Sequence, residues 1–79
     1  MLQQMSSSEL YERGLVLMEL RMFHPAIDDF QTVAKDARYA GKAYVPMALC
    51  LKAIGQEEEA VAAFRQAIMS PMVSPVEQH

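Results

Sequence analysis

The sequence matches itself when it is shifted by 34 residues. Every matched position is small or apolar, and the matches fall on a helical period. The identical pairs are Leu15 with Leu49, Leu17 with Leu51, Ala26 with Ala60, and Phe30 with Phe64. A period of this length is typical of chains that stack similar helical units. We therefore predict two copies of one unit, at about 7–40 and 41–74.

The composition favours helices and argues against strands. The chain has 79 residues, enough for one domain, and among them are eleven alanines, seven leucines and seven methionines. It contains no asparagine, only three glycines, and no Asn-Gly or Asp-Gly pair that would favour a hairpin turn. We expect an all-α fold and a single domain spanning residues 1–79.

The first copy has signals for two helices. Ser6 and Glu9 have the spacing of a capping box, so a helix is predicted to begin there. Pro25 suits the first turn of a second helix, because it lacks a backbone N–H that would otherwise be unpaired. The apolar stripes of the two helices are Leu10, Gly14, Leu17 and Leu20, then Ala26, Ile27, Phe30, Val33, Ala34 and Ala37.

The second copy repeats this plan. Pro46 is predicted to lie in the first turn of the third helix, and Gly55 to end that helix in a left-handed conformation. Residues 57–59 are glutamates that open the fourth helix, and the tail beyond residue 70 is predicted to be irregular because it holds two Ser-Pro steps. The stripes are Tyr44, Met47, Ala48, Leu51 and Ile54, then Ala60, Val61, Phe64, Ala67 and Ile68.

A 34-residue helix–turn–helix unit with these small and aromatic positions resembles the tetratricopeptide repeat. The resemblance rests on six residues and covers nearly the whole chain. It implies four antiparallel helices that form a segment of an α-solenoid, in which small residues let paired helices approach closely. The six signature residues are Gly14, Ala26, Phe30, Ala48, Ala60 and Phe64.

The resemblance also implies a binding surface. In this family the first helix of each pair lines a concave groove that binds a protein or peptide segment. The groove predicted here is apolar at its centre with lysines on one side, which suits an amphipathic or apolar segment. We expect an adaptor or a small chaperone. The groove residues are Tyr11, Leu15, Met18, Lys42, Val45, Leu49 and Lys52.

The residues do not indicate catalysis, a metal or cofactor site, nucleic-acid binding or a membrane segment. His24 is predicted to lie in a turn and Cys50 to be a small buried hydrophobe, so we expect no enzyme, cofactor or metal site. A net charge of −3 without a basic cluster argues against nucleic acid, and no apolar run suits a membrane. With a single cysteine and no recognisable signal peptide, we expect a cytoplasmic location.

Two alternatives stay open. Residues 1–5, the tail or a second copy of the chain are each able to cover part of the groove. The second alternative is that the module has a structural role, as a self-assembly or dimerisation element or as a piece of a larger regulator. Because the last helix pair would leave Val61, Ile68 and Met69 uncovered, we expect a homo-oligomer, a homodimer first.

Overall fold

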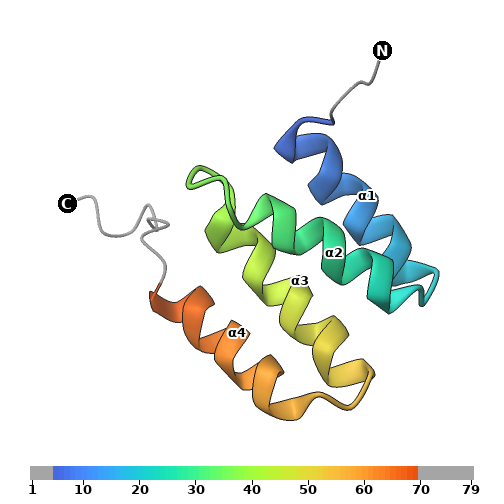
Figure 1. Cartoon of the computed structure of the whole chain (residues 1–79), viewed down its shortest axis with the longest axis vertical. Coiled ribbons are helices and arrows are strands. Elements are labelled where there is room, and N and C mark those ends of the chain that lie inside the picture. Colours follow the sequence, from blue (N-terminus) through green and yellow to red (C-terminus); the bar gives the residue numbers. More distant parts are fainter. Residues whose placement is uncertain (1–4, 70–79) are drawn as a thin grey trace.

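Four helices make up the part of the chain that the structure describes. The computed structural model describes residues 5–69, which contain no strand. Consecutive helices run in opposite directions and lie side by side (Figure 1). For residues 5–69, the prediction of an all-α fold with four antiparallel helices is confirmed. The helices are α1 (Ser7–Glu19), α2 (Phe23–Val33), α3 (Ala40–Ala53) and α4 (Glu57–Met69).

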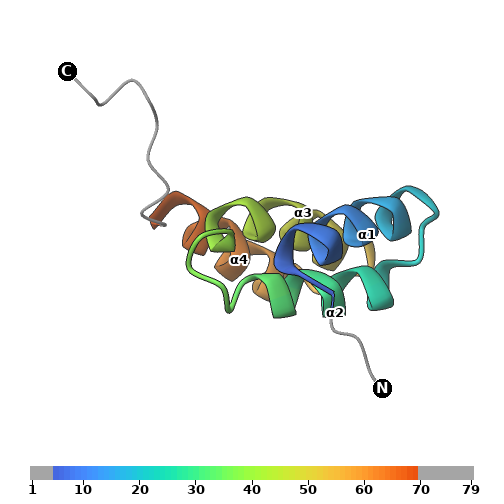
Figure 2. The same ribbon diagram turned by 90° about the horizontal axis from the view of Figure 1, so that it is seen from above.

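The helices form two layers. Seen from above, α1 and α3 lie in one layer and α2 and α4 in the other (Figure 2). Helix α1 packs on α2, α2 on α3, and α3 on α4, with a small further contact between α1 and α3. Within residues 5–69, α4 packs against α3 alone. One face of the molecule is therefore built by α1 and α3, and α4 has a side that no described helix covers.

Helix α1 begins at the predicted capping box. The Glu9 N–H donates to Ser6 Oγ at 3.2 Å, and the Ser6 N–H donates to Glu9 Oε1 at 2.9 Å. The two bonds satisfy backbone donors that have no partner inside the helix. The start of α1 is therefore determined by residues that are neighbours in the sequence.

Helices α1 and α3 end in the same way. After α3, Gly55 has a φ of +86°, and the N–H groups of Gly55 and Gln56 donate to carbonyls of the last turn at 3.0 and 2.9 Å. After α1, Arg21 has a φ of +63°, and Arg21 and Met22 donate at 3.0 and 2.8 Å. Both ends are Schellman motifs. Gly55 was predicted, whereas a left-handed arginine 34 residues earlier was not.

Helix α2 is shorter than predicted. Pro25 is its third residue, in the first turn as expected, but the helix ends at Val33 and excludes Ala34 and Ala37. The chain then turns around Asp36, whose carboxylate accepts hydrogen bonds from Ser7 Oγ at 2.7 Å and from the Arg38 backbone N–H at 3.0 Å. The turn between α2 and α3 is thereby connected to the start of α1.

The prediction for Pro46 is wrong. Helix α3 begins at Ala40, so Pro46 is its seventh residue rather than part of its first turn. A proline there removes one helical hydrogen bond. The turn before it stays helical because Gly41 and Ala43 are buried in the packed interior, and Pro46 is itself buried. Packing offsets the missing bond.

Gly14 lies where α1 and α2 come closest. A Cβ atom on Gly14 would lie 2.7 Å from Cε1 of Phe30 and 2.8 Å from its Cζ. Phe30 is completely buried, and the Tyr11 ring packs against it edge to face with centroids 6.0 Å apart. The prediction that a small residue here lets the paired helices approach is confirmed for the first hairpin.

An ion pair between the exposed Arg13 and the buried Asp29 also joins α1 to α2. Arg13 donates from Nε to Asp29 Oδ2 at 2.8 Å and from Nη2 to Oδ1 at 2.9 Å. Asp29 is only 6% exposed, so the bidentate contact compensates for its desolvation. The equivalent positions in the second hairpin are Met47 and Ala63, both buried. The two hairpins therefore use different chemistry at one structural position.

Candidate functional site

The seven residues of the predicted groove come from α1 and α3. Tyr11, Leu15 and Met18 lie on α1 and are half-buried, and the other four lie on α3 and are exposed. We call this set the α1/α3 face. The two helices lie in the same layer, so the α1/α3 face belongs to one side of the molecule (Figure 2). Its members are Tyr11, Leu15, Met18, Lys42, Val45, Leu49 and Lys52.

Tyr11 and Lys42 are the clearest contact within the α1/α3 face. The Lys42 ammonium lies 4.8 Å from the centroid of the Tyr11 ring and 5.8 Å from that of Tyr39. A cation over two aromatic rings is held by their negative faces. Tyr11 also contacts Phe30, which is fully buried. This end of the α1/α3 face is thus anchored to the core.

The centre of the α1/α3 face is apolar and open. Val45 is 43% exposed and Leu49 is 48% exposed. They are four residues apart on α3, so their side chains lie on the same side of that helix. Large aliphatic side chains in adjacent exposed positions are a common feature of protein-binding surfaces.

The remaining members line separate hollows. Leu15 contributes to a hollow on α1 whose other lining residues are Glu12, Val16, Glu19 and Leu20. Lys52 lines a hollow of about 260 Å³ between α3 and α4, together with Glu57, Ala60, Val61 and Phe64. The structure therefore brings Tyr11 and Lys42 together, but it assigns Leu15 and Lys52 to different hollows.

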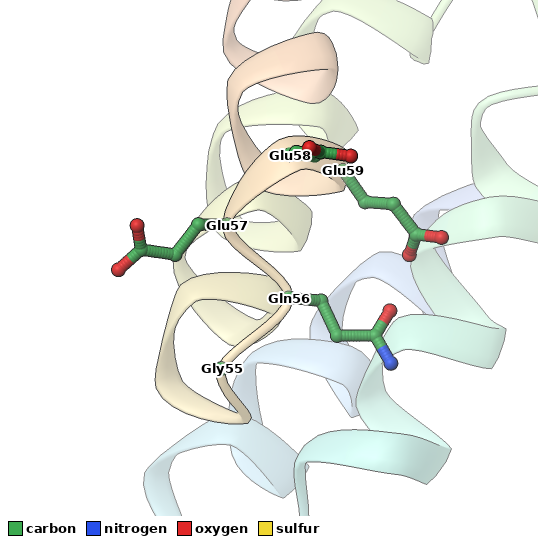
Figure 3. Close-up of a pocket in the computed structure, with 5 residues that line it drawn as sticks. All are labelled: Gly55, Gln56, Glu57, Glu58 and Glu59. Atoms are coloured by element: carbon green, nitrogen blue, oxygen red, sulfur yellow. The ribbon is translucent and has the colours of Figure 1, made fainter.

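A larger and very open hollow lies at the start of α4. Gly55, Gln56 and Glu57, Glu58 and Glu59 line it. Glu57 and Glu59 project to opposite sides of the helix (Figure 3). Consecutive helical residues point about 100° apart, so these carboxylates do not converge. Acidic residues in a first helical turn are stabilised by the helix dipole, which accounts for the run.

The cysteine and the histidine of the described residues do not form a reactive site. Cys50 is completely buried in α3, as predicted, and burial raises the pKa of its thiol. A buried thiol with a raised pKa is a poor nucleophile. His24 is exposed as the second residue of α2 rather than in the turn before it.

Two residues of α4 that were predicted to be buried are exposed. Val61 and Ile68 were assigned to the buried stripe, but they are 53% and 82% exposed. Ala60 is buried, and Phe64 and Ala67 are half-buried. The stripe is narrower because α4 contacts only α3 within the described residues. The separate expectation that the last hairpin leaves Val61, Ile68 and Met69 uncovered agrees with this exposure.

Comparisons of the chain with protein-family models, with curated proteins and with solved structures found no match. In residues 5–69, no helix has both the length and the apolar character needed to cross a membrane. The same range holds no group of three or more histidine, cysteine, aspartate or glutamate residues placed to bind a metal ion. The irregular tail predicted from about residue 70, and the end of the second copy, lie outside the described residues.

Proposed function

We propose that this protein is a non-catalytic interaction module of two tetratricopeptide-like repeats. In this proposal the hairpins α1–α2 and α3–α4 are the two repeats. The α1/α3 face binds an amphipathic or apolar segment of another protein, and the module acts as an adaptor or a small chaperone. The support is the 34-residue period, the close approach at Gly14 and the equivalent helix ends at Arg21 and Gly55.

One observation carries the proposal: Val45 and Leu49 are large, apolar and nearly half exposed on adjacent turns of α3. Burying each of them beneath a partner would contribute roughly 1 kcal/mol, taking about half of the value for full burial. Met18, the methionine of the α1/α3 face, is half-buried on α1 and has an unbranched, adaptable side chain. These side chains suit the apolar stripe of a bound helix.

The two lysines of the α1/α3 face add charge selectivity. Lys42 and Lys52 are ten residues apart on α3, which is about 15 Å along a helix. The chain carries a net charge of −3, so these cations are local exceptions on an acidic protein. A partner helix with acidic groups about 15 Å apart on either side of its apolar stripe would match both charge and shape.

The proposal can be tested with peptides selected from a random amphipathic library displayed on phage. The affinity of a selected peptide is measured by fluorescence anisotropy for the wild type and for Val45→Glu/Leu49→Glu. We expect a loss of at least tenfold, because two charges would be buried against an apolar stripe. Both positions are exposed, so the helical circular dichroism spectrum should be unchanged.

Val16→Glu/Leu20→Glu is the matched control. These residues are also exposed aliphatic side chains; they line a hollow on α1 together with Leu15 but are not members of the α1/α3 face. An equal loss in both double variants would indicate non-specific hydrophobic binding. Failure to select any peptide, or unchanged affinity in Val45→Glu/Leu49→Glu, would contradict the proposal.

A second candidate function is structural self-assembly, with the module as a dimerisation element or part of a larger regulator. The observation that favours it is the exposed apolar side of α4, where Ile68 is 82% exposed. The two candidates use different surfaces, so they are separable by substitution.

A further inference from the structure

One side of α4 carries an uncovered stripe with an ordered pattern of charge. Five residues share this side, because their spacing places them within about 100° around the helix axis. Val61 and Ile68 are exposed aliphatic residues, Phe64 is half-buried, and the flanking Glu57 and Arg65 are exposed. We call this set the α4 stripe: Glu57, Val61, Phe64, Arg65 and Ile68.

The equivalent stripe of α2 is covered by a helix. Ile27 is 34 residues before Val61 and is 7% exposed, against 53% for Val61. Phe30 is likewise fully buried, whereas Phe64 is only half-buried. The cover on α2 is α3, which runs antiparallel to it (Figure 1). A surface of this kind is thus shaped to accept an antiparallel helix.

The charges of the α4 stripe are arranged symmetrically about Val61. Glu57 precedes Val61 by four residues and Arg65 follows it by four, which is about 6 Å in each direction. Neither side chain forms an ion pair within residues 5–69. In an antiparallel pair of α4 helices centred on Val61, Glu57 of each copy would lie beside Arg65 of the other. The stripe is therefore complementary to itself.

We propose that the α4 stripe binds the α4 stripe of a second copy of this chain in an antiparallel, two-fold symmetric contact. Val61 lies near the symmetry axis, and two Glu57–Arg65 ion pairs form between the copies. Ile68 lies about 10.5 Å from the axis. It reaches the turn before the partner copy's α4, at the end of the hollow between α3 and α4 that Lys52 and Glu57 line.

A head-to-tail contact between copies is less well matched. The outer side of α1 also exposes Val16 and Leu20, and it could cover α4 as α3 covers α2. An antiparallel α1 would, however, bring Glu19 to the start of α4, where Glu57 and two further glutamates already lie. Such a contact also repeats without closing and gives open chains rather than dimers.

The area of one helix stripe is small, so the dimer should be weak. Interfaces below about 1,200 Å² are typical of transient complexes. We therefore expect the dissociation constant of the dimer to lie in the micromolar range. It can be measured by sedimentation equilibrium of the full chain from micromolar to millimolar concentration. The wild type should fit a monomer–dimer equilibrium.

Charge exchange tests both the surface and its register. Arg65→Glu and Glu57→Arg should each weaken the dimer by at least about tenfold, because each replaces two attractive pairs with two repulsive ones. The double variant Glu57→Arg/Arg65→Glu should recover the wild-type affinity. Glu59→Arg, on the other side of the same first turn, should leave the dimer unchanged.

Several results would overturn the inference. A wild type that remains monomeric at millimolar concentration, as it would if residues outside 5–69 covered the stripe, removes the contact. A series of higher oligomers indicates head-to-tail association instead. A double variant as weak as its parents excludes the antiparallel register. Of the α1/α3 face, Lys52 lies at the edge of this contact, whereas Val45 and Leu49 are not part of the α4 stripe. The peptide-binding proposal is therefore tested independently by its own variants at Val45 and Leu49.

Discussion

Replacing Gly14 with alanine tests how tightly α1 and α2 are packed. The added methyl carbon would lie 2.7 Å from one ring carbon of Phe30 and 2.8 Å from another. Carbon atoms prefer separations of about 3.5–4.0 Å, so one of the two side chains must shift. Gly14 is in the middle of a helix, where alanine is favoured over glycine by about 1 kcal/mol. The sign of the effect depends on whether Phe30 is able to move.

The surroundings of Phe30 indicate that it is held in place. Its ring is completely buried and contacts Tyr11 edge to face. The second hairpin has alanine at the position equivalent to Gly14, namely Ala48, but there the corresponding Phe64 is half-exposed. Phe64 lies on the uncovered side of α4, whereas α3 covers Phe30. Phe64 can therefore make room for the methyl group of Ala48, but Phe30 cannot make room for the methyl group that Gly14→Ala adds.

Overpacking a buried site costs typically 1–3 kcal/mol, and an enclosed aromatic ring places this site near the upper end. Subtracting about 1 kcal/mol for helix propensity leaves a net loss of about 2 kcal/mol. For a chain of this size that loss lowers Tm by roughly 8–16 °C. Urea unfolding followed by circular dichroism measures the free energy, and thermal unfolding measures Tm.

Two further variants make the argument falsifiable. Ala62→Gly, at an exposed position of α4, measures helix propensity alone and should cost about 1 kcal/mol. Phe30→Leu opens space beside residue 14, so the double variant Gly14→Ala/Phe30→Leu should be more stable than the sum of the single effects predicts. If Gly14→Ala equals or exceeds the wild type in stability, or if the two effects are additive, the packing argument is refuted.

Three other predictions concern the ion pair, the helix ends and acid. Arg13→Met should lower Tm by several degrees more than Asp29→Ala, because it leaves a buried carboxylate unpaired, and the double variant should recover most of the loss. Arg21→Gly should raise Tm by a few degrees and Gly55→Ala should lower it, since a left-handed backbone costs a non-glycine residue roughly 1–2 kcal/mol. Hydrogen bonds from an arginine and a serine hold the pKa of Asp36 below its ordinary value, so this residue stabilises the fold at neutral pH. That stabilisation should fall away on acidification below about pH 5, and Asp36→Asn should flatten this part of a plot of unfolding free energy against pH.

The features predicted correctly from the sequence are those that depend on near neighbours. The capping box needs only Ser6 and Glu9, three residues apart, and the end of α3 needs only a glycine after the last turn. The close approach at Gly14 involves residues 16 apart, but the internal period identifies the position as one that must be small. Local signals and the repeat therefore suffice for the order of the elements and for most of their ends.

The errors arise where packing between helices outweighs a local preference. Pro46 is disfavoured inside a helix, yet burial of the preceding turn keeps α3 continuous through it. Ala34 and Ala37 favour helix, but the chain turns at Asp36, which contacts Ser7 at the start of α1. In each case the deciding contact comes from a distant part of the chain, and no window of neighbouring residues contains it.

The ion pair of Arg13 and Asp29 was missed although the sequence contains a signal for it. The 34-residue shift aligns Arg13 with Met47 and Asp29 with Ala63. Apolar residues at both equivalent positions indicate that these positions lie at the contact between paired helices, and opposite charges at two such positions indicate an ion pair. The positions at which the two copies differ therefore locate this contact, whereas the positions at which they agree do not.

The same comparison explains why the candidate surfaces were harder to predict than the fold. Most positions that are alike in both copies serve packing, which every repeat requires, although Leu15 and Leu49 are alike and belong to the α1/α3 face. Surfaces depend on what adjoins each copy: Ile27 and Val61 are both apolar, but only the first has a helix beside it. The changes between copies follow this difference, because Phe23 and Gln31 of α2 correspond to the charged Glu57 and Arg65 of α4. Charged residues at an apolar contact surface determine which partner binds there and in which register. Glu57 and Arg65 are therefore the residues that should determine the specificity of this surface.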